Sequence, residues 1–125
     1  MTNTTSKFSI KSFAYAFKGL KEAAGTQPNF KFHIVSAILV IAGGLLFKIA
    51  GIEWALIFFA IGMVTAAECF NTALEYLTNL VSPQQNVMAG KVKDLSAAGV
   101  LICSFSAAVV GLIIFVPKIW SWFGV

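Results

Sequence analysis

Hydrophobic residues run through this chain in long stretches that short polar segments separate. The longest covers residues 95–116 and contains no charged side chain. A helix needs about 20 apolar residues to cross the hydrocarbon core of a bilayer, so this stretch predicts a membrane span. A second apolar stretch covers residues 34–52 with Lys48 near its end, and a third opens at Trp54. We therefore predict three transmembrane helices, over about residues 31–50, 53–80 and 92–120.

The connections between these spans differ in length. Residues 48–53 predict a tight turn, and residues 82–91 a longer loop. Pro83 ends the middle helix, because the residue before a proline avoids the helical region.

The N-terminal segment, over about residues 7–24, predicts a helix of another kind. At 100° per residue its apolar side chains gather on one side and its charged ones on the other. The two sides hold Ile10, Phe13, Phe17, Leu20 and Ala24, against Lys7, Lys11, Lys18, Lys21 and Glu22. We expect this amphipathic helix to lie on the membrane surface with its lysines near anionic headgroups. The alternative is that this helix packs against other protein. In either case Gly25, Pro28 and Asn29 break the helix before the first span begins.

The composition excludes a soluble globule and sets an orientation. Hydrophobic residues make up 58% of the chain and charged residues 11%. All nine basic residues are lysines, and seven of them fall in the N-terminal segment or in residues 91–93. The positive-inside rule then places the N-terminus and the second loop in the cytoplasm. The first 30 residues lack the apolar core of a signal peptide, so the first span is expected to remain.

Two carboxylates stand inside the middle span. Glu68, Asn71, Glu75 and Asn79 follow the spacing i, i+3, i+7 and i+11, which places them on one stripe of a helix. An ionisable side chain within a membrane costs about 2.5 kcal/mol or more, so it is a functional hypothesis by default. With Trp54 at the outer interface, Glu68 lies about 21 Å and Glu75 about 31 Å along the helix. A lipid hydroxyl and a cytosolic phosphate donor would meet along such a stripe.

The chemistry of this stripe has two interpretations. A carboxylate held out of water is a stronger proton acceptor, which suits Glu68 as a general base toward an alcohol. Lys93 and Asp94 stand just before the third span, and a lysine there can meet a phosphate as a point charge. Together they predict a site for a metal-bound nucleotide. The alternative is a lock between helices, with Glu68 or Glu75 paired to a lysine of a neighbouring segment.

Several motifs carry a resemblance to a known family. They are 13–20 (FAYAFKGL), 29–33 (NFKFH), 53–54 (EW), 68–75 (ECFNTALE), 93–94 (KD) and 114–118 (IFVPK). Over nearly its whole length the chain resembles the small prokaryotic integral-membrane lipid kinases, the diacylglycerol kinase and undecaprenol kinase family. The soluble-kinase phosphate loops are absent from the sequence.

The resemblance implies a fold and an activity. The expected fold is an all-α membrane protein, a homotrimer of three-span subunits with a surface helix, in the bacterial cytoplasmic (inner) membrane. The expected reaction moves the γ-phosphoryl group of ATP to a lipid alcohol with Mg²⁺, and no nucleic acid is involved. Glu68 corresponds to the proton acceptor, and Glu75 to a metal ligand with Gln27 at the second metal position. Positions expected to bind ATP are Tyr15, Gln27, Asn71, Glu75, Gln84, Asn86, Lys93 and Asp94.

Three departures from the family pattern stand beside this. Gln27 and Asn79 occupy positions where the family has acids, and Asn86 one where it usually has histidine. Magnesium commonly needs only one or two carboxylates when phosphates and water complete its shell, so we predict activity with a higher magnesium requirement. Two other hypotheses stay open: a degenerate, non-catalytic lipid-binding protein, and an ion pathway lined by Glu68 and Glu75. Undecaprenol is slightly favoured over diacylglycerol as the acceptor.

The remaining reactive side chains predict no further site. Cys69 and Cys103 fall in apolar helices and are expected to be small buried side chains rather than a disulfide or metal pair. His33 has no second histidine to join it. At the start of a span we expect it to contact a headgroup or the backbone.

Overall fold

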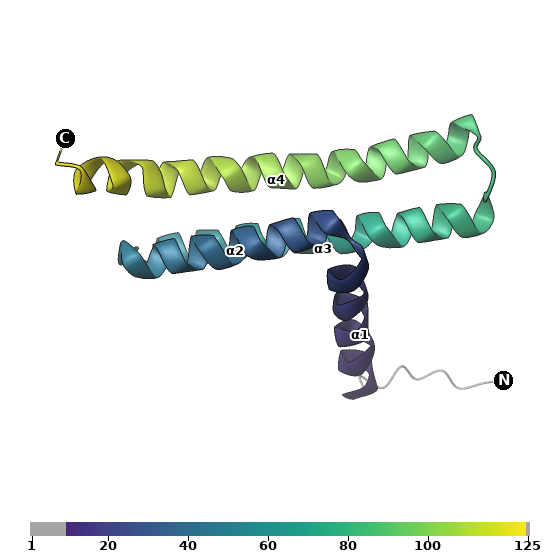
Figure 1. Cartoon of the computed structure of the whole chain (residues 1–125), viewed down its shortest axis with the longest axis horizontal. Coiled ribbons are helices and arrows are strands. Elements are labelled where there is room, and N and C mark those ends of the chain that lie inside the picture. The colour runs from purple at the N-terminus through teal and green to yellow at the C-terminus, as the bar shows by residue number, and fades with distance from the viewer. Residues whose placement is uncertain (1–9, 125) are drawn as a thin grey trace.

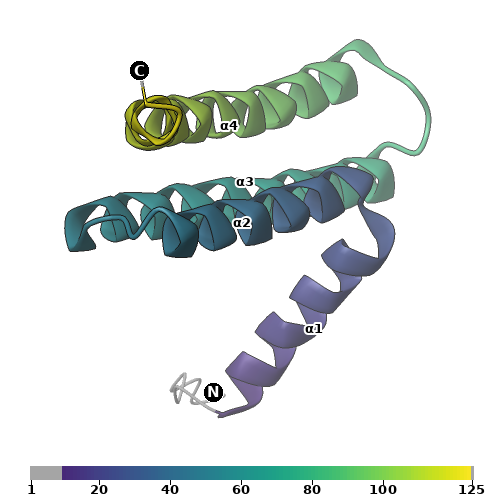
Figure 2. The same cartoon turned by 60° about the vertical axis from the view of Figure 1, so that its left-hand side comes forward.

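The computed structural model describes residues 10–124, and within them the chain forms four α-helices. These are α1 (Ile10–Thr26), α2 (Pro28–Leu46), α3 (Gly51–Val81) and α4 (Val87–Trp122). Helices α2, α3 and α4 lie side by side, while α1 extends away from them at a steep angle from the start of α2 (Figures 1 and 2). In this part of the chain α2, α3 and α4 are long and apolar enough to cross a membrane. The prediction of three spans in an all-α protein is confirmed.

The junction between α1 and α2 is shorter than the sequence indicated. Helix α1 continues through Gly25 to Thr26, and Pro28 begins α2 instead of separating it from α1. A proline fits the first turn of a helix because its missing N–H has no partner there anyway. The expected residues 7–9 of the surface helix lie outside the described part of the chain.

A tight turn joins α2 to α3, as predicted, but α2 ends at Leu46 and not near residue 50. Lys48 has a φ of 50°, a left-handed conformation that reverses the chain, and the N–H of Ile49 bonds back to Gly44 O at 3.1 Å. Glu53 then supports the start of α3, since its Oε2 accepts a hydrogen bond from the N–H of Ala50 at 3.2 Å.

The second connection is only five residues long, residues 82–86, and the predicted loop over 82–91 is wrong at its far end. Asn86 explains the difference, because its Oδ1 accepts a hydrogen bond from the N–H of Ala89 at 2.8 Å and caps α4. Lys93 and Asp94 therefore stand on the early turns of α4. Helix α3 ends at Val81, where Pro83 predicted its end.

The core of the single chain is small. Ile49, Ile57 and Ile114 form its buried cluster. Most large apolar side chains of the three spans point outward, as Phe59 at 70% exposure and Ile113 at 69% show. In a bilayer these outward-facing side chains can meet lipid, so the fold of the single chain depends on few internal contacts.

Candidate active site

Glu68 occupies the most unusual environment in the described chain. It stands in the middle of α3, yet only 2% of its surface is exposed. Its Oε1 lies 3.1 Å from Nε2 of His33, which comes from the second turn of α2. The expectation that His33 contacts a headgroup or the backbone is therefore wrong, because it reaches across to Glu68. The alternative of a lock between Glu68 and a lysine is also wrong, since the neighbouring group is an imidazole.

The contact between His33 and Glu68 is close without being a hydrogen bond. Oε1 of Glu68 is buried and, although it lies 3.1 Å from Nε2 of His33, it has no hydrogen-bond partner among the described residues. The hydroxyls of Thr72 and Ser104 are buried without partners in the same way. Buried polar atoms are nearly always hydrogen-bonded, so each exception asks for an explanation.

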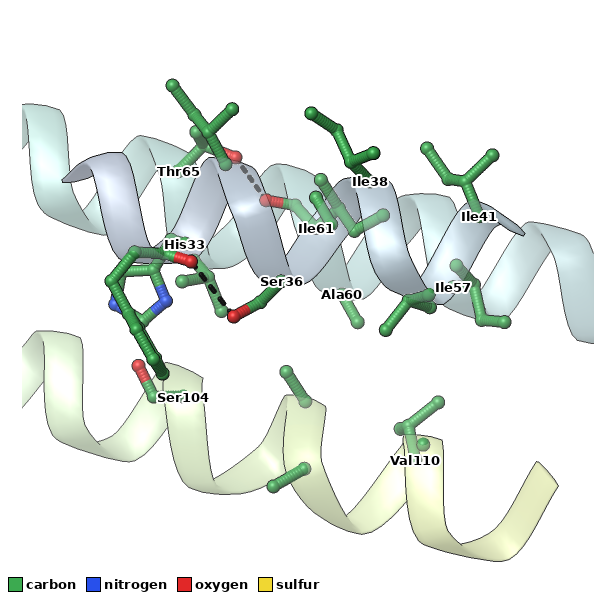
Figure 3. A pocket seen from close by; sticks show the side chains of 18 residues that line it. His33, Ser36, Ile38, Ile41, Ile57, Ala60, Ile61, Thr65, Ser104 and Val110 are labelled. Carbon is green, nitrogen blue, oxygen red and sulfur yellow. Dashed lines mark hydrogen bonds between the residues drawn. The ribbon is translucent and has the colours of Figure 1, made fainter. Parts of the chain in front are cut away.

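An apolar cleft of about 430 Å³ lies between α2, α3 and α4. Its polar side chains are few, and Figure 3 shows that His33, Thr65 and Ser104 lie toward one end. Ile41, Ile57 and Val110 lie toward the other end in the same view. Glu68 follows Val64 of the cleft wall by one helical turn and contacts His33. The buried carboxylate thus stands where the apolar cleft becomes polar.

Two side chains of the predicted stripe connect α3 to α4. The Ser96 hydroxyl donates to Asn71 Oδ1 at 2.7 Å, and Lys93 Nζ donates to Asn79 Oδ1, also at 2.7 Å. Glu75 lies between these two bonds along α3 and is half-buried. It has no hydrogen-bond or ion-pair partner among the described residues. A lysine and a free carboxylate therefore occur on facing stretches of the two helices.

The end of α1 contacts the same part of α3. Tyr76 Oη donates to Glu22 Oε1 at 3.2 Å and lies 3.4 Å from Thr26 Oγ1. Gln27, the next residue, donates from Nε2 to that Thr26 hydroxyl at 3.1 Å. The pairing between Glu22 and Tyr76 could not be predicted from the sequence, because the two residues are far apart in the chain. The Glu22–Tyr76 hydrogen bond brings Gln27 toward the turn of α3 that carries Glu75.

The predicted metal position is not a preformed cluster. Among residues 10–124 no group of three or more histidine, cysteine, aspartate or glutamate side chains could hold a metal ion. Glu75 offers one unpartnered carboxylate, and Gln27 uses its amide nitrogen for Thr26, which leaves its amide oxygen for another group. This donor set fits Mg²⁺ that takes most of its ligands from phosphates and water.

The other positions expected to bind ATP are not gathered around one point. Tyr15 on α1 is 70% exposed, and Asp94 on α4 is exposed. Asn86 caps α4 and also donates to the Ser82 hydroxyl at 2.5 Å, while the backbone oxygen of Gln84 accepts from Ser82 at 3.0 Å. Their roles toward ATP stay predictions.

The opposite end of the bundle holds an ion pair. Lys118 Nζ of α4 lies 2.8 Å from Glu53 Oε1 and donates a hydrogen bond to it. We call this the ion-paired end, which also contains the turn 47–50. We call the end with His33, Glu68, Glu75 and Lys93 the polar end.

These features define a three-span membrane protein with a polar site at one end of an apolar cleft. Residues 14–115 match the family described as "Prokaryotic diacylglycerol kinase", and the chain belongs to this family. Membership confirms the predicted resemblance and makes the protein an ATP-dependent lipid kinase.

Curated relatives agree with this assignment. The chain is 36% identical over 110 residues to an undecaprenol kinase of Bacillus subtilis (strain 168), covering 88% of this chain and 89% of that one. It is 32% identical to a diacylglycerol kinase of Synechocystis sp., covering 90% of this chain and 65% of that one. It is also 28% identical to a diacylglycerol kinase of Escherichia coli (strain K12), covering 99% and 100%.

Proposed function

We propose that this protein transfers the γ-phosphoryl group of ATP to the hydroxyl of a membrane lipid alcohol, with Glu68 as the general base. The observation that carries the proposal is the buried Oε1 of Glu68, which has no hydrogen-bond partner among the described residues. A general base needs a free lone pair within reach of the proton that it removes. A substrate hydroxyl would supply the donor that this oxygen lacks.

The cleft suits the tail of such a substrate. Its lining is almost entirely apolar, and its few polar side chains lie toward the Glu68 end. A lipid whose tail occupied this cleft would direct its hydroxyl toward the carboxylate. Exclusion of water there would also protect the phosphate donor from hydrolysis.

The phosphate donor would bind beside Glu75, Lys93 and Asp94. Lys93 has three N–H donors and uses one of them for Asn79, so the others are free to meet phosphate oxygens. Asp94 is the next residue on the same helix turn and is exposed. Tyr15, Gln84 and Asn86 would contribute from α1 and from the loop 82–86.

Glu75 and the amide oxygen of Gln27 would bind Mg²⁺, and the phosphates of ATP would bind the same ion. The ion would neutralise charge on the β- and γ-phosphates during transfer. With a single carboxylate in the shell, most of the ligands come from ATP and water.

The assembly that we propose is a homotrimer in the bacterial inner membrane. Three helices do not shield a polar stripe from lipid on every side, so neighbouring subunits would complete the site. The lysine distribution favours a cytoplasmic N-terminus. Helix α1 would lie on the membrane surface, because apolar side chains such as Ile10 and Phe17, 89% and 68% exposed, find no cover within the chain.

The acceptor lipid is proposed to be undecaprenol, ahead of diacylglycerol. The relative named undecaprenol kinase is 36% identical, whereas two relatives named diacylglycerol kinase are 32% and 28% identical. Both alcohols present a hydroxyl at the membrane interface, so the same base would serve either of them.

One assay tests the reaction and the acceptor together. The purified full chain is given ATP labelled at the γ-phosphate, and label is measured in undecaprenol and diacylglycerol supplied side by side. We expect label in both, with faster transfer to undecaprenol. The same assay with Glu68→Gln should show almost no transfer, because an amide cannot accept the hydroxyl proton.

Two results would contradict the proposal. Full transfer by Glu68→Gln would remove this residue from its role as base. A folded native chain that labels neither lipid would instead favour the degenerate lipid-binding protein, or an ion pathway if ion flux through vesicles depended on Glu68.

A further inference from the structure

Among the described residues that line the cleft, His33 is the one charged or titratable side chain, and it adjoins the proposed base. Its Nε2 lies 3.1 Å from Glu68 Oε1, within the distance over which a proton passes between two such groups. The two side chains differ in access to solvent, since the exposed fraction is 18% for the His33 side chain and 3% for the Glu68 side chain. Glu68 thus has a more accessible neighbour that can accept a proton.

The surroundings isolate this pair from other charges. The residues that line the cleft include no aspartate, glutamate, lysine or second histidine. From α4 the cleft receives the Ser104 hydroxyl, and on α3 the nearest titratable neighbour of Glu68 in sequence is the Cys69 thiol. On α1, Glu22 is engaged with Tyr76. Within residues 10–124, His33 is therefore the side chain placed to exchange a proton with Glu68 at Oε1.

A purely structural role explains the geometry poorly. The structural ion pair of this chain, between Lys118 and Glu53, is a 2.8 Å hydrogen bond at the edge of the bundle. The His33–Glu68 contact is longer, lies deeper and leaves Oε1 without a hydrogen-bond partner in the described part of the chain. A structural contact between helices is stronger when it includes a hydrogen bond, whereas a general base needs its oxygen free for the substrate.

We propose that His33 is a positioning and proton-transfer residue that returns Glu68 to its ionised form after each turnover. This inference rests on the proposed function. In the transfer step the O–H bond of the alcohol breaks and its oxygen bonds to the γ-phosphorus. The bond from that phosphorus to the β,γ-bridging oxygen breaks to release ADP, and the proton goes to Glu68.

The second step concerns only the protein and water. Neutral His33 accepts the proton from Glu68 at Nε2, which leaves a carboxylate and an imidazolium. The imidazolium then releases the proton to water and is neutral again. Without this route the proton has to leave a carboxyl group that is almost wholly buried. The first transfer would then be fast, and deprotonation of Glu68 would limit every later turnover.

The test compares the first turnover with the steady state in the full chain. His33→Gln keeps a polar side chain near Glu68 but cannot take up a proton. We expect the single-turnover rate to stay within about twofold of wild type, while steady-state kcat falls about tenfold or more and the KM for lipid changes little. Lys31→Gln introduces the same side chain two residues earlier on α2 and should leave both rates unchanged.

The pH profile gives a readout that a structural role would not move. In the wild type, steady-state kcat should fall toward acid pH more than the single-turnover rate does, because an imidazole that already carries a proton accepts no second one. In His33→Gln, kcat should lack this additional fall. The comparison of the two wild-type rates needs no variant, so it decides the question even if His33→Gln and the second choice, His33→Asn, do not fold.

Clear outcomes overturn the inference. They are an unchanged kcat in His33→Gln, an equal fall of both rates, or an acid fall that is identical in the single turnover. The failure of the proposed function is separate, because active Glu68→Gln removes the base itself. If Glu68→Gln is inactive and His33→Gln has the rates of the wild type, only the proton route through His33 is excluded.

Discussion

Two glutamates of α3 stand in opposite circumstances. At the ion-paired end, Glu53 uses Oε1 for Lys118 and Oε2 for the N–H of Ala50. At the polar end, Glu68 is buried, and its Oε1 has no hydrogen-bond donor among the described residues. A carboxylate with both oxygens satisfied holds helices together, whereas a buried one left open retains its capacity to react. The comparison separates a structural acid from a functional one on the same helix.

The largest expected effect comes from exchanging the two acids for glutamine in turn. Glu68→Gln should lower lipid phosphorylation by about 10²- to 10⁴-fold, the usual range for removal of a general base. Its melting temperature should not fall, because a buried charge is removed. Glu53→Gln should do the reverse, with activity retained and a measurable drop in melting temperature. Kinetics and thermal unfolding in the same detergent check both, and parallel losses in the two variants would end the comparison.

Glu75 gives the next largest effect at the polar end. Its carboxylate, which has no partner in the part of the chain that the structure describes, is the one anionic metal ligand that we propose. Glu75→Gln should raise the Mg²⁺ concentration for half-maximal activity by about tenfold or more, since even an outer-shell partner is typically worth that much. Titration of Mg²⁺ at fixed ATP measures this. A curve that coincides with the wild type would place the metal elsewhere.

The ion-paired end can be weakened without touching the site. A Cβ on Gly44 would lie 2.7 Å from Trp54 Cη2 and 3.1 Å from Ile49 Cδ1. Gly44→Ala should therefore lower stability by about 1–3 kcal/mol through overpacking. Gly62→Ala, where nothing lies within 4 Å, is the matched control. Unfolding in a denaturing detergent compares them, and KM for ATP should remain normal in the folded fraction.

The smallest effect is a gain. Gln27→Glu adds a carboxylate beside the end of α1 and should lower the Mg²⁺ requirement on the order of a few-fold. The same Mg²⁺ titration tests it, with Gln85→Glu as a variant of equal charge in the other connection. An unchanged requirement in Gln27→Glu, or an equal gain in both, would show that Gln27 is not a ligand.

The sequence predicted local features well. Apolar run length predicted the three spans, and Pro83 predicted the end of α3 at Val81. The early start of α4 was also within reach, because asparagine is a favoured cap and Asn86 lies directly before the helix. The predicted loop over residues 82–91 ran past this cap.

Contacts between distant residues were not predictable in the same way. The spacing placed Glu68 and Glu75 on one stripe, but it does not say which helix faces each of them. His33 meets Glu68 because α2 runs antiparallel to α3 from a turn of only four residues, 47–50. Glu22 meets Tyr76 because the C-terminal end of α1 lies against α3, while the rest of α1 extends away from the bundle (Figure 2). Both depend on how helices cross, which one sequence does not specify.

The separation of the two ends also has a consequence for the lipid product. Glu68, Glu75 and Lys93 all belong to the polar end, while the other end is occupied by the pair of Glu53 and Lys118. In the proposed reaction the hydroxyl enters and the phosphate is added on one side of the bilayer. The product therefore stays in the leaflet from which its alcohol came, and any transbilayer movement of the phosphorylated lipid falls to another protein.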